Sequence, residues 1–122
     1  MNFIKGRLKA FVYAFKGLKI LISSEDSFKA QFFIGLFAVL LGFIFKISET
    51  EWMIQLLTIG LVLVAEALNT GIEKIADFIH PDYHKKIEVL KDIAAGAALI
   101  AAIIAVIIGC IIYIPRITVL FS

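Results

Sequence analysis

Five polar side chains follow one face of a predicted helix in the middle of the chain: Glu66, Asn69, Thr70, Glu73 and Asp77. At 100° per residue, the three carboxylates and the threonine fall within roughly 60° of one another, and the asparagine lies at the edge of that arc. Residues 52–65 before them are apolar apart from Gln55 and Thr58, so this helix enters a bilayer and becomes acidic partway across. Because ionisable groups inside a membrane are costly, this acidic stripe is a candidate functional site.

The composition indicates an integral membrane protein. The 122 residues are 61% hydrophobic and 18% charged, with a mean hydropathy of +1.00, which excludes an ordinary soluble domain of this size. Cys110 lies alone in an apolar run, so neither a disulfide nor a cysteine metal cluster is expected. The first residues are charged and amphipathic, and no cleavable signal is expected.

An amphipathic helix is predicted over residues 4–22. Its apolar side chains recur every three or four residues, and its cations lie on the other sides. Five cations in residues 4–22 would each be costly deep in a bilayer. A helix that lies in the membrane interface is therefore favoured over a first transmembrane span. Its lysines are then expected to extend towards anionic headgroups.

Three apolar stretches are long enough to cross a membrane as helices: residues 28–47, 52–79 and 93–114. Polar segments at 23–27, 46–51 and 80–92 separate them, and Pro115 and Arg116 are predicted to end the third. The predicted fold is therefore an all-α membrane protein. It is one domain over residues 1–122, with one surface helix and three transmembrane helices.

The basic residues predict the orientation in the membrane. Ten of the twelve lie in residues 1–29 and 74–91, so the positive-inside rule places the N-terminus and the loop after the second span in the cytoplasm. From Trp52 to Glu66 the helix rises about 21 Å, which puts Glu66 past the middle of the bilayer. Glu73 then approaches the cytoplasmic surface.

The same surface is predicted to receive Glu25, Lys91 and Asp92. Carboxylates and an amide oxygen suit Mg²⁺, which shares phosphate oxygens in nucleotide sites, and a lysine meets the phosphate charge. The implied substrates are a cytosolic nucleotide and a lipid alcohol. Three spans offer too little surface to shield such a stripe from lipid, so an oligomer is expected.

Two other classes of protein fit parts of this pattern. A small proton-coupled or cation-coupled transporter would use Glu66 as its cation site, but the outer halves of the spans offer no polar path to the far side. A scaffold or regulatory subunit gives no reason for Glu66, Asn69 and Glu73 to share a face.

Two further patterns have structural interpretations. His80 and His84 are four residues apart, but Pro81 and Asp82 between them favour a turn, so no metal is expected there. Small residues recur along the third span at positions 98, 102, 105 and 109. This ridge is predicted to pack helices together.

The chain resembles the small prokaryotic integral membrane lipid kinases that include diacylglycerol kinase and undecaprenol kinase. The resemblance rests on Glu66-x-x-Asn69-Thr70-x-Ile72-Glu73-x-x-x-Asp77, Tyr83-His84 and Lys91-Asp92-x-Ala94-Ala95-Gly96-Ala97, and it extends to Tyr13-x-x-Lys16-Gly17-Leu18 and Glu25-x-x-Phe28. It implies a homotrimer in the bacterial inner membrane, with active sites at subunit boundaries. The run from Lys91 to Gly96 is more similar to the undecaprenol kinases, which modestly favours that lipid.

The resemblance also implies the roles of individual residues, with ATP as phosphoryl donor and Mg²⁺ as cofactor. Glu66 resembles the general base for the lipid hydroxyl, and Glu25 and Glu73 resemble the metal-coordinating pair at the nucleotide. The other positions implied around the nucleotide are Tyr13, Asn69, Asp77, Asp82, Tyr83, His84, Lys91 and Asp92. Arg7 or Lys9 is the approximate counterpart of a basic residue in the family's surface helix, and Gln31 stands where some members have a second acid.

Overall fold

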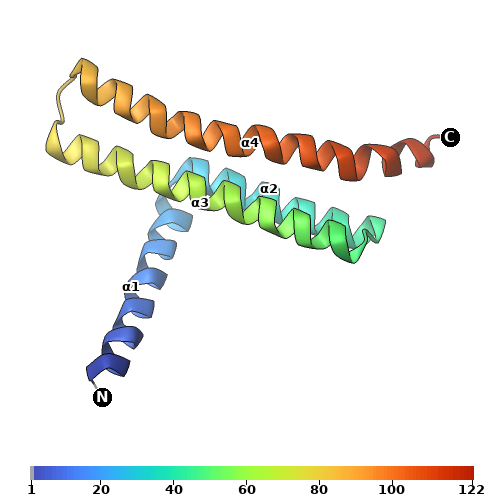
Figure 1. Ribbon diagram of the computed structural model, residues 1–122, viewed down its shortest axis with the longest axis horizontal. Helices are drawn as coiled ribbons and strands as arrows, with labels where there is room; N and C mark the ends of the chain where they lie inside the picture. The colour runs from blue at the N-terminus through green and yellow to red at the C-terminus, as the bar shows by residue number, and fades with distance from the viewer. Residues whose placement is uncertain (1) are drawn as a thin grey trace.

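The computed structural model describes residues 2–122, which form four α-helices and contain no strand (Figure 1). The helices are α1 (Asn2–Ser24), α2 (Asp26–Phe45), α3 (Glu49–Ile79) and α4 (Lys85–Leu120). Helix α3 packs against both α2 and α4, and α1 projects away from this bundle (Figure 1). Helices α2, α3 and α4 are each long and apolar enough to cross a membrane. The prediction of an all-α protein is confirmed, and so is that of three helices suited to span a membrane.

Helix α1 covers slightly more of the chain than residues 4–22, and none of its described residues is buried. Its apolar side chains, such as Phe11 and Phe15, are exposed, and so are its cations. The hydroxyl groups of Ser23 and Ser24 donate to the carbonyls of Lys19 and Ile20, so they extend α1 and do not cap α2. A single residue, Glu25, therefore separates α1 from α2. The interfacial position of α1 stays a prediction.

Two glycines let α2 approach α3 closely. A Cβ atom at Gly35 would lie 2.9 Å from Ile59, and one at Gly42 would lie 2.7 Å from the ring of Trp52. Trp52 also packs against Phe43, with ring centroids 4.8 Å apart. Any side chain at these two positions would push the helices apart, since such distances are shorter than van der Waals contact.

The α2–α3 turn differs from the predicted bounds by a few residues at each side. Helix α2 ends at Phe45, before the predicted 47, because Lys46 adopts a left-handed conformation with φ of 51°. Helix α3 begins at Glu49, before the predicted 52, because Ser48 and Glu51 form a reciprocal capping box.

The third span is longer than the predicted 93–114, and the prediction that Pro115 ends it is wrong. Helix α4 begins at Lys85, where the ring of His84 accepts a hydrogen bond from the backbone N–H of Lys86. It continues through Pro115 to Leu120. Next to the proline, the guanidinium of Arg116 donates to the carbonyl of Ile112 and to the Glu51 carboxylate of α3. Pro115 removes one helical N–H donor, and the contacts of Tyr113 and Arg116 with α3 hold this part of α4 in place.

The bridge to α3 belongs to a far-end clamp, a name used here for Glu51, Gln55, Tyr113 and Arg116. The guanidinium of Arg116 donates to both carboxylate oxygens of Glu51, at 2.8 and 2.6 Å. The Tyr113 hydroxyl lies between the side-chain oxygen of Gln55 and the carbonyl of Ala38, so it links α4 to both other spans. Tyr113 also belongs to a small apolar core, together with Ile47 and Ile112.

Candidate functional site: a polar cleft between α3 and α4

A cleft of about 490 Å³ opens where α3 ends and α4 begins. Its walls are the last turns of α3, the loop at residues 80–84 and the first turns of α4. The polar side chains that line it are Glu73, Asp77, His80, Asp82, Tyr83, His84, Glu88, Lys91 and Asp92. This group is called the polar cleft below.

The charges of the polar cleft are unbalanced. Five carboxylates line it, against a single lysine and two histidines. Lys91 of α4 donates to the Asp77 carboxylate of α3 at 2.8 Å, which ties the two helices together at the cleft. The remaining carboxylates form an acidic surface, on which a polyphosphate is bound only together with cations.

The loop of the polar cleft carries three rings. The rings of His80 and His84 meet edge to face at 5.1 Å, and Nδ1 of His80 lies 2.8 Å from the carbonyl of Asp82. The nearby Glu88 carboxylate raises the pKa of the Tyr83 phenol above its ordinary value. The phenol therefore stays neutral across the physiological range, and its exposed ring is free to stack on a planar group.

Seven of the eleven predicted site residues come together in the polar cleft. They are Glu73, Asp77, Asp82, Tyr83, His84, Lys91 and Asp92. Residues 73–92 are contiguous in sequence, but only the antiparallel return of α4 along α3 turns them into the two walls of one cleft. The other four predicted residues lie outside it.

Glu25 contacts Lys74 of α3, the residue that follows Glu73. Its carboxylate is 3.7 Å from the ammonium group of Lys74, and the joint between α1 and α2 is thus held beside the acidic stripe. Both members of the predicted metal pair therefore lie at the same end of the bundle. Among the residues that the structure describes, no three His, Cys, Asp or Glu side chains form a metal-binding cluster.

Asn69 carries a sign of an unfilled binding function that, among the described residues, only Nε2 of Gln55 shares. Its side-chain oxygen is buried and has no hydrogen-bond partner within residues 2–122. An unpaired buried carbonyl costs about 1–3 kcal/mol, so such an atom usually has a ligand or a partner subunit. Asn69 lies one turn from both Glu66 and Glu73 on α3, and carboxylates with an amide oxygen are a donor set that fits Mg²⁺ with its waters and phosphate oxygens.

Glu66 and Tyr13 lie on either side of this region. Glu66 is half-buried on α3, one turn before Thr70 and on the same face, so the predicted stripe is continuous. Tyr13 is exposed on α1, where Lys16 lies over its ring at 5.5 Å, and this chain does not bring it to the polar cleft.

Sequence reasoning missed three residues at this end of the molecule. His80 and Glu88 line the polar cleft, and Lys74 pairs with Glu25. Glu88 was detectable, because it lies one turn before Lys91 and Asp92 on the same helix. Lys74 gave only the weak signal of a cation within an acidic motif, since its partner is far away in sequence.

Comparison with known proteins identifies the family. The family described as prokaryotic diacylglycerol kinase matches residues 12–113. The chain is 36% identical to undecaprenol kinase of Bacillus subtilis (strain 168) over 108 residues, 88% of each chain. It is 33% identical to diacylglycerol kinase of Escherichia coli (strain K12) over 104 residues, 85% of each chain.

The chain therefore belongs to the prokaryotic diacylglycerol kinase family, and the predicted resemblance is confirmed. It is a lipid kinase, a phosphotransferase that uses an alcohol group as acceptor. Neither the family match nor the relatives support the alternative of a small transporter.

Proposed function

We propose that this lipid kinase transfers the γ-phosphoryl group of ATP to the hydroxyl group of undecaprenol in preference to diacylglycerol. The observation that carries the proposal is the polar cleft at one end of three apolar helices. A charged donor that arrives from water and an alcohol that arrives from the bilayer can meet only at such a boundary. The undecaprenol kinase of Bacillus subtilis among the relatives supports this choice of lipid.

In this proposal the polar cleft binds the nucleotide. Lys91 neutralises phosphate charge, and Tyr83 and His84 offer rings to the base. Asp77 orients Lys91 through their hydrogen bond, while Asp82 and Asp92 bind the nucleotide through its hydroxyl groups or hydrated cations.

Glu25 and Glu73 are the residues that would hold Mg²⁺, and the free oxygen of Asn69 belongs to a residue one turn before Glu73 on α3. When bound, the ion supplies charge neutralisation to the triphosphate. Glu25 must exchange its ion pair with Lys74 for this role, and the exchange is cheap because both side chains are partly exposed.

Glu66 accepts the proton of the lipid hydroxyl in this scheme. It is the deepest carboxylate of the stripe, about 10 Å along α3 from Glu73, so it lies where an alcohol held by the bilayer can reach it. A positioned base that removes the proton as the phosphoryl group arrives contributes a factor of about a hundred or more.

The proposal includes a homotrimer in the bacterial inner membrane, with its N-terminus and the polar cleft in the cytoplasm. The exposed large apolar side chains of α2, α3 and α4 support association or lipid contact along the spans. Tyr13 and the nearby cations of α1, including Arg7 and Lys9, would complete the nucleotide site of a neighbouring subunit.

The test measures phosphate transfer from γ-labelled ATP to undecaprenol and to diacylglycerol, at matched concentrations in the same detergent. We expect Mg²⁺-dependent labelling of both lipids, with the larger kcat/KM for undecaprenol. Equal values, or a larger value for diacylglycerol, would reverse the proposed preference. Labelling of neither lipid would overturn the proposal as a whole.

A further inference from the structure

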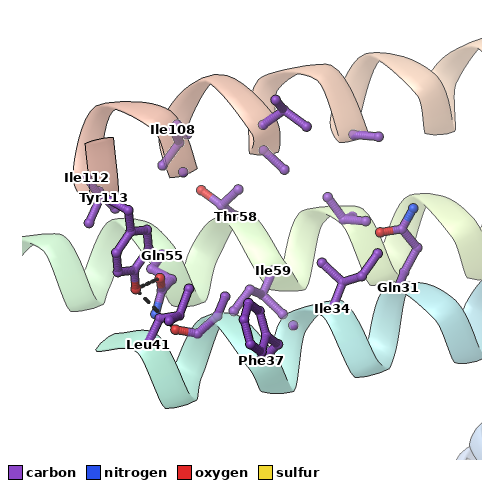
Figure 2. A pocket seen from close by; sticks show the side chains of 17 residues that line it. Gln31, Ile34, Phe37, Leu41, Gln55, Thr58, Ile59, Ile108, Ile112 and Tyr113 are labelled. Carbon is purple, nitrogen blue, oxygen red and sulfur yellow. Dashed lines mark hydrogen bonds between the residues drawn. The ribbon is translucent and has the colours of Figure 1, made fainter. Parts of the chain in front are cut away.

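An apolar groove of about 360 Å³ runs between α2, α3 and α4, and the proposed chemistry does not use it (Figure 2). Ile34 and Phe37 of α2 and Ile59 of α3 face it in the close view. On α4 its wall includes Ala102 and Ala105, two members of the small-residue ridge. The ridge therefore leaves open space at this level, where larger side chains would have filled it.

The hydroxyl groups around the groove already have partners, whereas the side-chain nitrogen of Gln55 is buried without one among the described residues. The Thr58 hydroxyl donates to the carbonyl of Ile54 at 2.7 Å, and the Tyr113 hydroxyl is held by Gln55 and Ala38. Tyr113 and Gln55 lie at the end of the groove that adjoins the far-end clamp (Figure 2). An occupant thus finds no free hydroxyl on these walls, and a hydrocarbon is the chemistry that matches them.

The other end of the groove leads to Glu66. Three groove residues of α3 lie on the same face as Glu66, within an arc of roughly 60° around the helix axis: Gln55, Ile59 and Val62. The acidic stripe therefore continues into the groove wall. Helices α2 and α3 are antiparallel, with Gly42 beside Trp52 and Gly35 beside Ile59. Gln31, another lining residue, lies one turn before Gly35 and so near the level of Val62. The groove therefore begins about one helical turn from the proposed base.

We propose that this groove binds one hydrocarbon chain of the lipid alcohol while its hydroxyl group lies at Glu66. This inference rests on the proposed function and adds to it a binding site for the substrate chain. From Glu66 to the end of the groove at Gln55 is about 16 Å along α3. A dry cavity of about 150 Å³ is known to hold benzene, so about 360 Å³ corresponds to roughly fifteen carbon atoms.

The size of the groove decides between possible occupants. A transmembrane helix of a second copy is about 10 Å across with its side chains and is too wide for this space. The two chains of a diacylglycerol exceed it too, so one chain would stay in the bilayer. A single polyprenyl chain enters with its first three isoprene units, and the remainder extends into lipid.

The main contribution of the groove is to align the lipid chain, and it adds little binding free energy for hydrocarbon. A lipid chain in a bilayer is already out of water, so the groove offers packing contacts and no hydrophobic transfer. Those contacts hold the hydroxyl at a fixed depth beside Glu66. Filling the groove should therefore raise the KM for the lipid about tenfold and leave the KM for ATP unchanged.

Ala105→Phe tests this by filling the groove, and Cys110→Phe places the same ring on the exposed side of α4 as a control. The substrates are single-chain primary isoprenoid alcohols of about ten to thirty carbons. For the unaltered protein, kcat/KM should rise up to about fifteen carbons and then level off. In the Ala105→Phe variant, kcat/KM should level off at alcohols with fewer carbon atoms. Identical chain-length profiles for the two variants would overturn the inference.

A second measurement needs neither a variant nor turnover. A fifteen-carbon primary alcohol with a diazirine near its middle is photolysed in the presence of the full-length protein, and the labelled peptides are identified by mass spectrometry. Labels on groove residues such as Ala102 and Ile108 support the site, and labels confined to exposed residues such as Ile103 and Ile107 contradict it. Absence of phosphate transfer to every alcohol would instead refute the proposed function, because labelling does not require it.

Discussion

The two ends of the α3–α4 pair both carry an ion pair, but they differ in exposure and in charge balance. At the far-end clamp, the Arg116–Glu51 pair is about three-quarters buried, and each charge is matched by its partner. At the polar cleft, the Lys91–Asp77 pair leaves 64% of the Asp77 side chain exposed, and four further carboxylates have no matching cation there. Paired charges fix two helices, whereas an excess of one charge is the feature that binds a ligand.

The far-end clamp also explains how a small chain can hold an acidic site in place. The clamp and the α3–α4 loop join the two long helices near both ends, so the stripe between them cannot slide. A site supported in this way keeps its geometry without a tightly packed core around it.

The largest effect should come from the polar end, in Glu73→Gln. Loss of this carboxylate removes half of the proposed metal pair, and we expect turnover to fall by at least about a thousandfold, the scale of charge stabilisation in phosphoryl transfer. Glu49→Gln, an exposed acid near the far-end clamp, is the matched control and should keep its activity. A wild-type rate for Glu73→Gln at limiting Mg²⁺ would show that the metal assignment is wrong.

A smaller loss is expected deeper in the stripe. Glu66→Gln preserves shape but removes the proposed base, so the chemical step should slow about a hundredfold while Mg-ATP binding and assembly persist. Single-turnover transfer measures this step directly. Because phosphoryl transfer often needs little activation of the nucleophile, a near wild-type rate is the competing outcome, and it would leave Glu66 as a positioning residue.

Lys91→Met should affect nucleotide binding more than chemistry. It removes the single lysine of the polar cleft and a hydrogen bond to Asp77, and we expect the KM for ATP to rise about tenfold, or about 1.4 kcal/mol. Lys85→Met at the start of α4 lies outside the cleft and serves as control. Unchanged kinetic constants for ATP would reassign Lys91 to membrane orientation or headgroup contact.

The smallest effect should come from the far-end clamp. Arg116→Met breaks the two-pronged contact with Glu51 and is expected to lower stability by about 1 kcal/mol, because the pair is only partly buried. A lower midpoint of thermal unfolding in detergent, with unchanged kcat, is the expected pattern. A large loss of kcat at unchanged stability would contradict the division between a supporting end and a reacting end.

The amino-acid sequence determined the helices and their order, because hydropathy and a period of 3.6 residues are local properties. It also determined the acidic stripe from Glu66 to Asp77, since residues of one helix keep their relative directions whatever surrounds them. Its errors lay at the ends of helices, where capping by Ser48 and His84 and the side chain of Arg116 decided the bounds. The interpretation of Pro115 as a helix end was wrong, because whether a helix continues through a proline depends in part on packing against residues distant in sequence.

Only the tertiary structure decided which polar groups are satisfied and which remain free. The pairing of Glu25 with Lys74 and of Glu51 with Arg116 joins residues far apart in the chain, and no local pattern specifies such partners. The free oxygen of Asn69 and the space beside Ala105 are likewise properties of helix packing. Sequence periodicity says which face a side chain occupies, but the distance between two faces is set by every residue packed between them.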